Sequence, residues 1–113
     1  MSYQEVAARA LDALGDPTRR AVLEVLKGGA QPVGEIARHL PVSRPAVSQH
    51  LRVLKEAGLV RDRKDGTRRL YSVEPEGLGD LRRYLEGLWD SALDAFAAHV
   101  DKDNSKEREG RRS

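Results

Sequence analysis

The chain contains no cysteine, and this absence excludes two classes of protein at once. Without thiols there are no disulfide bridges, so a disulfide-stapled secreted scaffold is ruled out. Thiolate metal sites and redox sensing by thiols are ruled out as well, because the only sulfur atom belongs to Met1.

Long apolar runs and catalytic motifs are also missing. The longest apolar runs are too short to span a bilayer, and the opening MSYQEVAARALDALG contains acids and no signal-peptide hydrophobic block. We therefore expect a soluble, cytoplasmic protein without a membrane partner. No glycine-rich phosphate loop precedes a helix, so we expect neither enzymatic activity nor a cofactor. The 113 residues suffice for one compact domain with its own core.

The net charge of +2 conceals an uneven distribution along the chain. Residues 1–42 hold five basic and five acidic side chains, whereas residues 43–71 hold eight basic and three acidic, a local charge of +5. Residues 72–100 hold two basic and six acidic side chains (−4), and residues 101–113 hold five and four (+1). This pattern indicates a polyanionic partner that meets one surface, although basic side chains also gather by chance on solvated faces.

The first half of the chain predicts helices with clear ends. Apolar residues at helical spacing predict a helix over residues 3–14, which Gly15 ends. Asp16 is placed to cap a second helix, and Pro17 suits its first position because no N–H is needed there. Gly28-Gly29 stops this second helix.

The stretch QPVGEIARHLPVS predicts a short third helix, which Pro41 cannot continue. Ser43 is placed to cap a fourth helix over residues 43–57, and Gly58 provides a left-handed stop. A tight turn between two short helices is the layout of a helix-turn-helix.

The fourth helix has an apolar side for the core, formed by Val47, Leu51 and Leu54. Its opposite side is polar. An ordinary amphipathic helix would simply expose such a side to water. Gln pairs with adenine, Arg with guanine and Ser with either base, so we expect Ser48, Gln49 and Arg52 to contact base edges. Arg44 is expected to join them from the helix start, and His50 to pack or to contact phosphate. The predicted DNA-binding residues of this helix are Ser43, Arg44, Ser48, Gln49, His50 and Arg52.

The following residues predict a basic hairpin, with two extended runs around Asp65-Gly66, where glycine tolerates positive φ. Such a hairpin beside a recognition helix can reach the DNA backbone or minor groove, and its tip residues Lys64, Thr67 and Arg68 are expected nearest. The predicted contacts are Arg63, Lys64, Arg68 and Arg69. Tyr71 and Val73 are expected to pack at the base. Charges also protect exposed strands from aggregation, so the hairpin alone does not indicate DNA.

Residues 77–100 return to helical spacing and carry more apolar side chains than a small core needs from one terminal helix. The excess predicts a homodimer. Residues 1–100 would then form a DNA-binding and dimerisation domain, and the charged residues 101–113 a disordered tail.

The stretches ALGDPTRRAVLEVLKGG and PVGEIARHLPVSRPAVSQHLRVLKEAGLVRDRKDGTRRLYSV, with the closing helix, resemble the ArsR/SmtB (arsenic-repressor) family of winged helix-turn-helix transcriptional regulators. The resemblance covers residues 3 to about 99, and its block VSxHLxxLxxAGLVxxxxxGxxxxY runs from Val47 to Tyr71. It implies a mainly α fold with a small β-hairpin: five helices plus a two-stranded wing, dimerised through the first and last helices. It also implies inverted-repeat operators with half-sites about one helical turn apart. The expected interface residues are Val6, Ala10, Leu81, Leu85, Leu88, Trp89, Ala92 and Phe96.

The metal sites of this family are not matched here. Its thiolate site corresponds to Pro32, Val33 and Gly34, which offer no sulfur ligand. A second type of site needs paired histidine and carboxylate ligands on the last helix, and this chain lacks the spacing for tetrahedral zinc. The side chains available there are Asp80, Asp90, Asp94 and His99. We therefore expect no metal.

These patterns predict a homodimeric repressor that binds double-stranded DNA and occludes a promoter. It would be controlled by its own concentration, by a small organic ligand or by another protein, and the sequence does not identify the inducer. Tyr84 and Trp89 could line a ligand pocket, although such residues more commonly serve a core or an interface. The alternative is a winged-helix protein-interaction module with a solvated basic face, which would show no salt-sensitive affinity for DNA.

Overall fold

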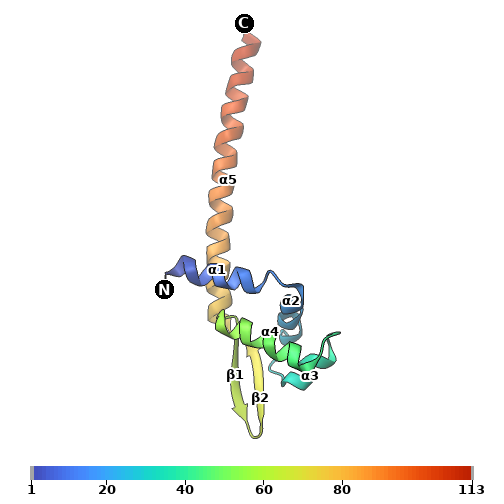
Figure 1. Cartoon of the computed structure of the whole chain (residues 1–113). Helices are drawn as coiled ribbons and strands as arrows, with labels where there is room; N and C mark the ends of the chain where they lie inside the picture. The colour runs from blue at the N-terminus through green and yellow to red at the C-terminus, as the bar shows by residue number, and fades with distance from the viewer. Residues whose placement is uncertain (1, 113) are drawn as a thin grey trace. The chain divides into compact units, whose positions relative to one another are not determined.

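The structure, a computed structural model, describes residues 2–112, with side chains described up to Asp101. Its elements follow the order α1 (Tyr3–Ala13), α2 (Pro17–Leu26), α3 (Val33–Arg38), α4 (Arg44–Glu56), β1 (Val60–Asp65), β2 (Arg68–Val73) and α5 (Pro75–Arg112) (Figure 1). Five helices and one antiparallel hairpin confirm the predicted fold class. The side chains of the predicted tail lie almost entirely outside the described part.

The chain divides into two compact units, Met1–Leu81 and Arg82–Ser113. The first unit contains the elements from α1 to β2 and the first residues of α5, and the second contains the remainder of α5. Within the described part, no helix has the length and apolar character that a membrane crossing requires.

Side-chain caps set the starts of the first two helices. The Oγ of Ser2 accepts a hydrogen bond from the Glu5 backbone N–H at 3.1 Å, and the Glu5 carboxylate accepts one from the Ser2 N–H at 3.3 Å. This reciprocal pair is a capping box. The predicted cap of α2 is confirmed, because Asp16 Oδ1 accepts hydrogen bonds from the N–H groups of Thr18 (2.7 Å) and Arg19 (3.1 Å).

The predicted helix-turn-helix is confirmed in α3 and α4. The Oγ of Ser43 accepts a hydrogen bond from the Ala46 N–H at 3.3 Å, which fixes the start of α4. The helix ends at Glu56 with Ala57 as its C-cap, and Gly58 follows with φ +79°, the left-handed conformation that glycine adopts without strain.

Helix α4 lies at the centre of the first unit, where it contacts α1, α2, α3 and β1. Its predicted apolar stripe is confirmed, because Val47, Leu51 and Leu54 are each 0% exposed. The core contains Ala10, Ala13, Val22, Leu26, Ile36, Val47, Leu51, Leu54, Leu59, Val60 and Leu81. Burial of one side of α4 on several elements leaves its opposite side facing outward.

The turn of the hairpin differs by one residue from the prediction. Asp65 pairs with Arg68, so the two turn residues are Gly66 and Thr67 rather than Asp65 and Gly66. Gly66 has φ +62°, and a two-residue hairpin loop with glycine at its first position accommodates that backbone. The predicted packing of Tyr71 against the core is confirmed.

A short backbone bridge joins β2 to the segment before α3, and the sequence did not predict it. The Gln31 N–H donates to the Tyr71 carbonyl at 2.9 Å, and the Tyr71 N–H donates to the Gln31 carbonyl at 2.8 Å. The Gln31 side-chain amide also donates to the Val25 carbonyl at 3.0 Å. These bonds fix the hairpin relative to α2 and α3.

The first residues of α5 pack closely on the end of α4. A Cβ atom at Gly77 would overlap the carbonyl oxygen of Gly58, so only glycine permits this approach. The Tyr3 hydroxyl donates a hydrogen bond to the Asp80 carbonyl at 2.7 Å and thereby links α1 to the start of α5.

Candidate nucleic-acid interface

The outward side of α4 carries the predicted base-contacting residues. Ser48, Gln49 and Arg52 are all exposed. The side chains of Ser48 and Gln49 form no hydrogen bond within the described part of the chain, so their donors and acceptors are free for a partner. Because Val47 and Leu51 are fully buried, the helix cannot rotate and these polar groups keep their direction.

Arg52 has a partner on the same helix. Its Nε lies 3.2 Å from Glu56 Oε1, in a pair whose side chains are 71% and 66% exposed. Exposed pairs of this kind contribute little to stability, so the guanidinium can exchange the carboxylate for another partner.

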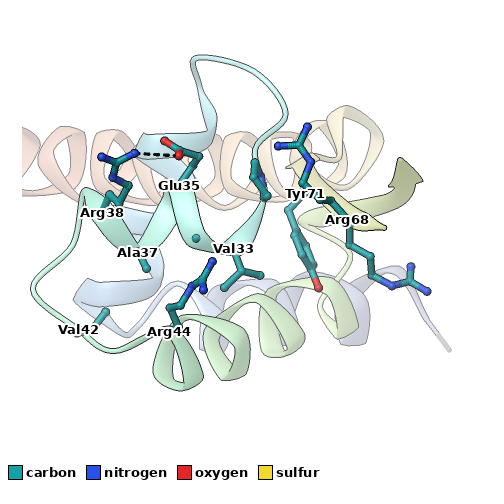
Figure 2. Close-up of a pocket in the computed structure, with 11 residues that line it drawn as sticks. Val33, Glu35, Ala37, Arg38, Val42, Arg44, Arg68 and Tyr71 are labelled. Carbon is teal, nitrogen blue, oxygen red and sulfur yellow. Dashed lines mark hydrogen bonds and ion pairs between the residues drawn. The ribbon is translucent and has the colours of Figure 1, made fainter. Parts of the chain in front are cut away.

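Ser43 and Arg44, at the start of α4, make other contacts. The Ser43 hydroxyl is used in the helix cap. The Arg44 guanidinium lies against Gly34 on α3, where a Cβ atom would overlap its Nη2 (Figure 2). Arg44 is thus directed toward α3 rather than along the side that carries Gln49.

His50 of α4 is half-buried. The pKa of Asp16 is lowered, first by the hydrogen bond from the Arg19 backbone N–H and then by the Thr18 N–H and the charges of Arg19 and His50. The partial burial of His50 favours the packing role over base contact.

The cations of the wing divide into paired and unpaired residues. Arg61 lies 3.8 Å from Glu74, Arg68 lies 3.7 Å from Asp65, and Arg69 lies 2.9 Å from Asp62. Arg63 and Lys64 are exposed and have no ion-pair partner among the described residues. The uncompensated positive charge of the wing is therefore concentrated at these two residues.

Asp62 joins the wing to α4, and it was not among the residues selected from the sequence. Its side chain is only 8% exposed, and its oxygens lie 2.8 Å from Lys55 Nζ and 2.9 Å from Arg69 Nη1. The Lys55 hydrogen bond, the Arg69 hydrogen bond and both positive charges lower the pKa of Asp62 against the opposing effect of burial.

The predicted interface residues lie in two different environments. Ala10 and Leu81 are 3% and 5% exposed, so packing within one chain already accounts for their burial. Val6 and Ala92 are exposed. The second unit carries an exposed apolar surface, which we call the α5 apolar surface: Leu85, Leu88, Trp89, Leu93 and Phe96. The prediction omitted Leu93, which lies one turn after Trp89.

No group of three histidine, aspartate or glutamate side chains comes together to hold a metal among the described residues. The positions of the family's thiolate site, Pro32, Val33 and Gly34, line a pocket together with several arginines.

Comparison with protein families and sequences agrees with this geometry. The family described as a helix-turn-helix domain matches residues 14–63. The HTH-type transcriptional regulator Rv2034 of Mycobacterium tuberculosis is 53% identical over 103 residues, which cover 91% of this chain and 96% of that protein. The transcriptional repressor SdpR of Bacillus subtilis is 43% identical over 73 residues, covering 65% of this chain and 81% of that one.

Solved structures show the same architecture. An ArsR-like transcriptional regulator from Rhodococcus is 34% identical with a TM-score of 0.72, and the match covers 82% of this chain and 91% of that one. A homodimeric winged helix-turn-helix DNA-binding domain from Mycobacterium bovis is 29% identical with a TM-score of 0.64, covering 81% of this chain and 85% of that one.

Proposed function

Because the chain belongs to the ArsR/SmtB family of winged helix-turn-helix transcriptional regulators, we propose that it is a homodimeric repressor of an inverted-repeat operator. The observation that carries the proposal is the outward side of α4, with three exposed polar side chains on a helix locked by its buried stripe. Members of this family are DNA-binding regulators, and we propose no enzymatic activity.

In the proposed complex α4 enters the major groove. Gln49, Ser48 and Arg52 contact base edges, because amide, hydroxyl and guanidinium groups match the donors and acceptors there. Arg63 and Lys64 contact the backbone or minor groove, where their charges displace counterions. The link from Asp62 to Lys55 and Arg69 supports this arrangement, since it holds helix and wing in one relative position.

The dimer is proposed from the α5 apolar surface. Five large apolar side chains between 42% and 66% exposed are more than a monomer leaves in contact with water. They mark a surface that a second copy covers, and the similar M. bovis domain is described as homodimeric. A two-fold dimer places two α4 helices about one turn of DNA apart, which matches an inverted repeat.

We propose repression because a similar protein is a named repressor and because a DNA-bound dimer would cover two successive major grooves. SdpR, a similar protein, is named a transcriptional repressor. A dimer that occupies two successive major grooves blocks access to a promoter at that site. Control of DNA binding by the protein's own concentration, by a small organic ligand or by a partner protein stays a prediction.

The proposal is tested by recovering genomic DNA fragments that the full chain binds. The expected fragments share an inverted repeat, and affinity for them exceeds that for scrambled duplex by about 10³-fold or more. The Gln49→Ala variant should recover fragments with a weaker consensus. Equal affinity for recovered and scrambled DNA, or an affinity that does not change with salt, would support a protein-interaction module instead.

A further inference from the structure

A pocket of about 670 Å³ opens between α3, the start of α4 and β2 (Figure 2). Its walls include Gly34, Arg38, Arg44, Arg68, Arg69 and Tyr71. It lies on the part of the first unit where the recognition helix and the wing are joined, yet none of the predicted base-contacting residues except Arg44 belongs to it.

The pocket carries a strong positive charge. Four of its lining residues are arginines, and Glu35 is the only lining carboxylate. Arg38 is paired with Glu35 at 3.1 Å, and Arg68 and Arg69 are paired with acids of the wing. Arg44 has no ion-pair partner within the described part of the chain. Its charge is therefore the uncompensated one in the pocket.

Gly34 allows Arg44 to occupy this place. A Cβ atom at position 34 would overlap Nη2 of Arg44 and approach its Cζ at 3.0 Å, so the guanidinium rests against the α3 backbone only because residue 34 has no side chain. This guanidinium lies against the α3 backbone without an acid to neutralise it, so its N–H groups are available to the paired oxygens of an anion.

Tyr71 provides a fixed wall beside this charge. Its backbone forms two hydrogen bonds with Gln31, which tie this part of β2 to the segment before α3. The hydroxyl group is a hydrogen-bond donor that has no partner among the described residues. Figure 2 shows the Tyr71 ring and the Arg44 side chain on either side of Val33.

We propose that this pocket binds one phosphate group, held by the Arg44 guanidinium and the Tyr71 hydroxyl. Arginine forks fit phosphate oxygens, and the charge of the pocket matches an anion. The same chemistry accepts a backbone phosphate of the operator, in which case the inference rests on the proposed function, or the phosphate of a free small molecule. A free phosphate would compete with DNA for Arg44.

The first arm of the test uses inorganic phosphate and the full-length chain. Amide resonances of Gly34 and Tyr71 are followed by NMR while phosphate replaces chloride at constant ionic strength. Saturable shifts are expected in the wild type and in the control Arg9→Gln, which removes one exposed charge from α1. No such shifts are expected in Arg44→Gln.

The second arm uses the recovered operator duplex with one phosphate at a time replaced by a neutral methylphosphonate. One position per half-site should weaken binding of the wild type about tenfold, and the same replacement should leave Arg44→Gln unaffected. Gly34→Ala should behave like Arg44→Gln, because its Cβ displaces the guanidinium. The substitution should preserve folding, since alanine favours the helix and Arg44 is a flexible side chain.

A response in the phosphate arm alone assigns the pocket to a free phosphate, and a response in the duplex arm alone assigns it to the operator backbone. Both results support the site. If Arg44→Gln and Gly34→Ala match the wild type in both arms, the site does not exist. Operator binding by the wild type would still stand in that case, so the proposed function is judged separately.

Discussion

Asp62 on β1 accepts a hydrogen bond from the Lys55 ammonium group on α4, with 2.8 Å between nitrogen and oxygen. The same carboxylate binds Arg69 of β2 at 2.9 Å and is almost fully shielded from water. One acid therefore connects the recognition helix to both strands of the wing. It also neutralises part of the basic surface, which leaves Arg63 and Lys64 as the free cations of the wing.

Replacing Asp62 by asparagine should loosen this connection. We expect the free energy of unfolding to fall by about 1–2 kcal/mol at pH 7, because the charge-assisted hydrogen bonds from Lys55 and Arg69 are weakened. The loss is limited because the partly exposed Lys55 and Arg69 regain water. The pKa of Asp62 is lowered in the folded chain, so its contribution is present above the unfolded value near 3.8 and is lost as the pH falls through the folded value. Urea unfolding at a series of pH values measures both effects.

The control for this prediction is Asp65→Asn, which removes an acid from an exposed pair with Arg68. Its stability should stay close to that of the wild type. If Asp62→Asn and Asp65→Asn lose the same stability, or if the loss in Asp62→Asn does not shrink as the pH falls below the unfolded value, the buried connection is not what stabilises the wing.

Gln49→Ala should reduce discrimination between DNA sequences. Loss of the amide should cost about 1–3 kcal/mol of binding free energy on the operator and little on scrambled duplex. Fluorescence anisotropy titrations with both duplexes provide the measurement, and Gln4→Ala on the exposed part of α1 is the matched control. Wild-type affinity of Gln49→Ala for both duplexes would remove Gln49 from the interface.

Lys64→Gln and Arg63→Gln should weaken binding to every duplex to a similar extent. Each neutralised phosphate contributes about 0.9 to the slope of log affinity against log salt, so each variant should flatten the slope by about that amount. Arg61→Gln, whose guanidinium pairs with Glu74, should change the slope less. Identical slopes for wild type and both wing variants would show that the tip of the wing stays away from DNA.

Gly77→Ala should destabilise the first unit, because the new Cβ overlaps the Gly58 carbonyl and two backbones have to separate. We expect a loss of about 2–4 kcal/mol. Gly87→Ala, in the same helix with open space around its Cα, should keep or slightly raise stability. Thermal unfolding of the two variants compares them directly, and equal midpoints would mean that the contact between Gly77 and Gly58 is not close.

Trp89→Glu should dissociate the dimer. The indole is 66% exposed in a single chain, and a carboxylate inside an apolar interface would be buried without a partner. Sedimentation should show monomers at concentrations where the wild type is dimeric, while the neighbouring Asp90→Asn remains dimeric. A wild-type chain that stays monomeric at all concentrations contradicts the dimer itself.

The local features of this fold could be predicted because they depend on short-range chemistry. Apolar spacing located α4 and its buried residues Val47, Leu51 and Leu54, and the caps at Asp16 and Ser43 follow from side chains that satisfy the nearest free N–H groups. The exposure of Ser48 and Gln49 followed from the same helical projection.

The features that were missed depend on contacts between residues far apart in the sequence. Nothing local distinguishes Asp62 from the other acids of a charged hairpin, because Lys55 meets it only after the wing folds back on α4. The contact of Arg44 with Gly34 and the bridge of Gln31 with Tyr71 have the same origin. The turn at Gly66 was displaced by one residue because strand register, rather than the dipeptide, decides it.

Simultaneous contact of α4 and the wing with one duplex can be tested directly because the chain has no cysteine, so a single introduced thiol can be labelled selectively. A single Thr67→Cys substitution at the tip of the wing can carry an iron chelate that cleaves nearby DNA. We expect cleavage in the minor groove about half a helical turn from the bases that α4 contacts, in both halves of the operator. Uniform cleavage along the duplex, or none, would contradict it.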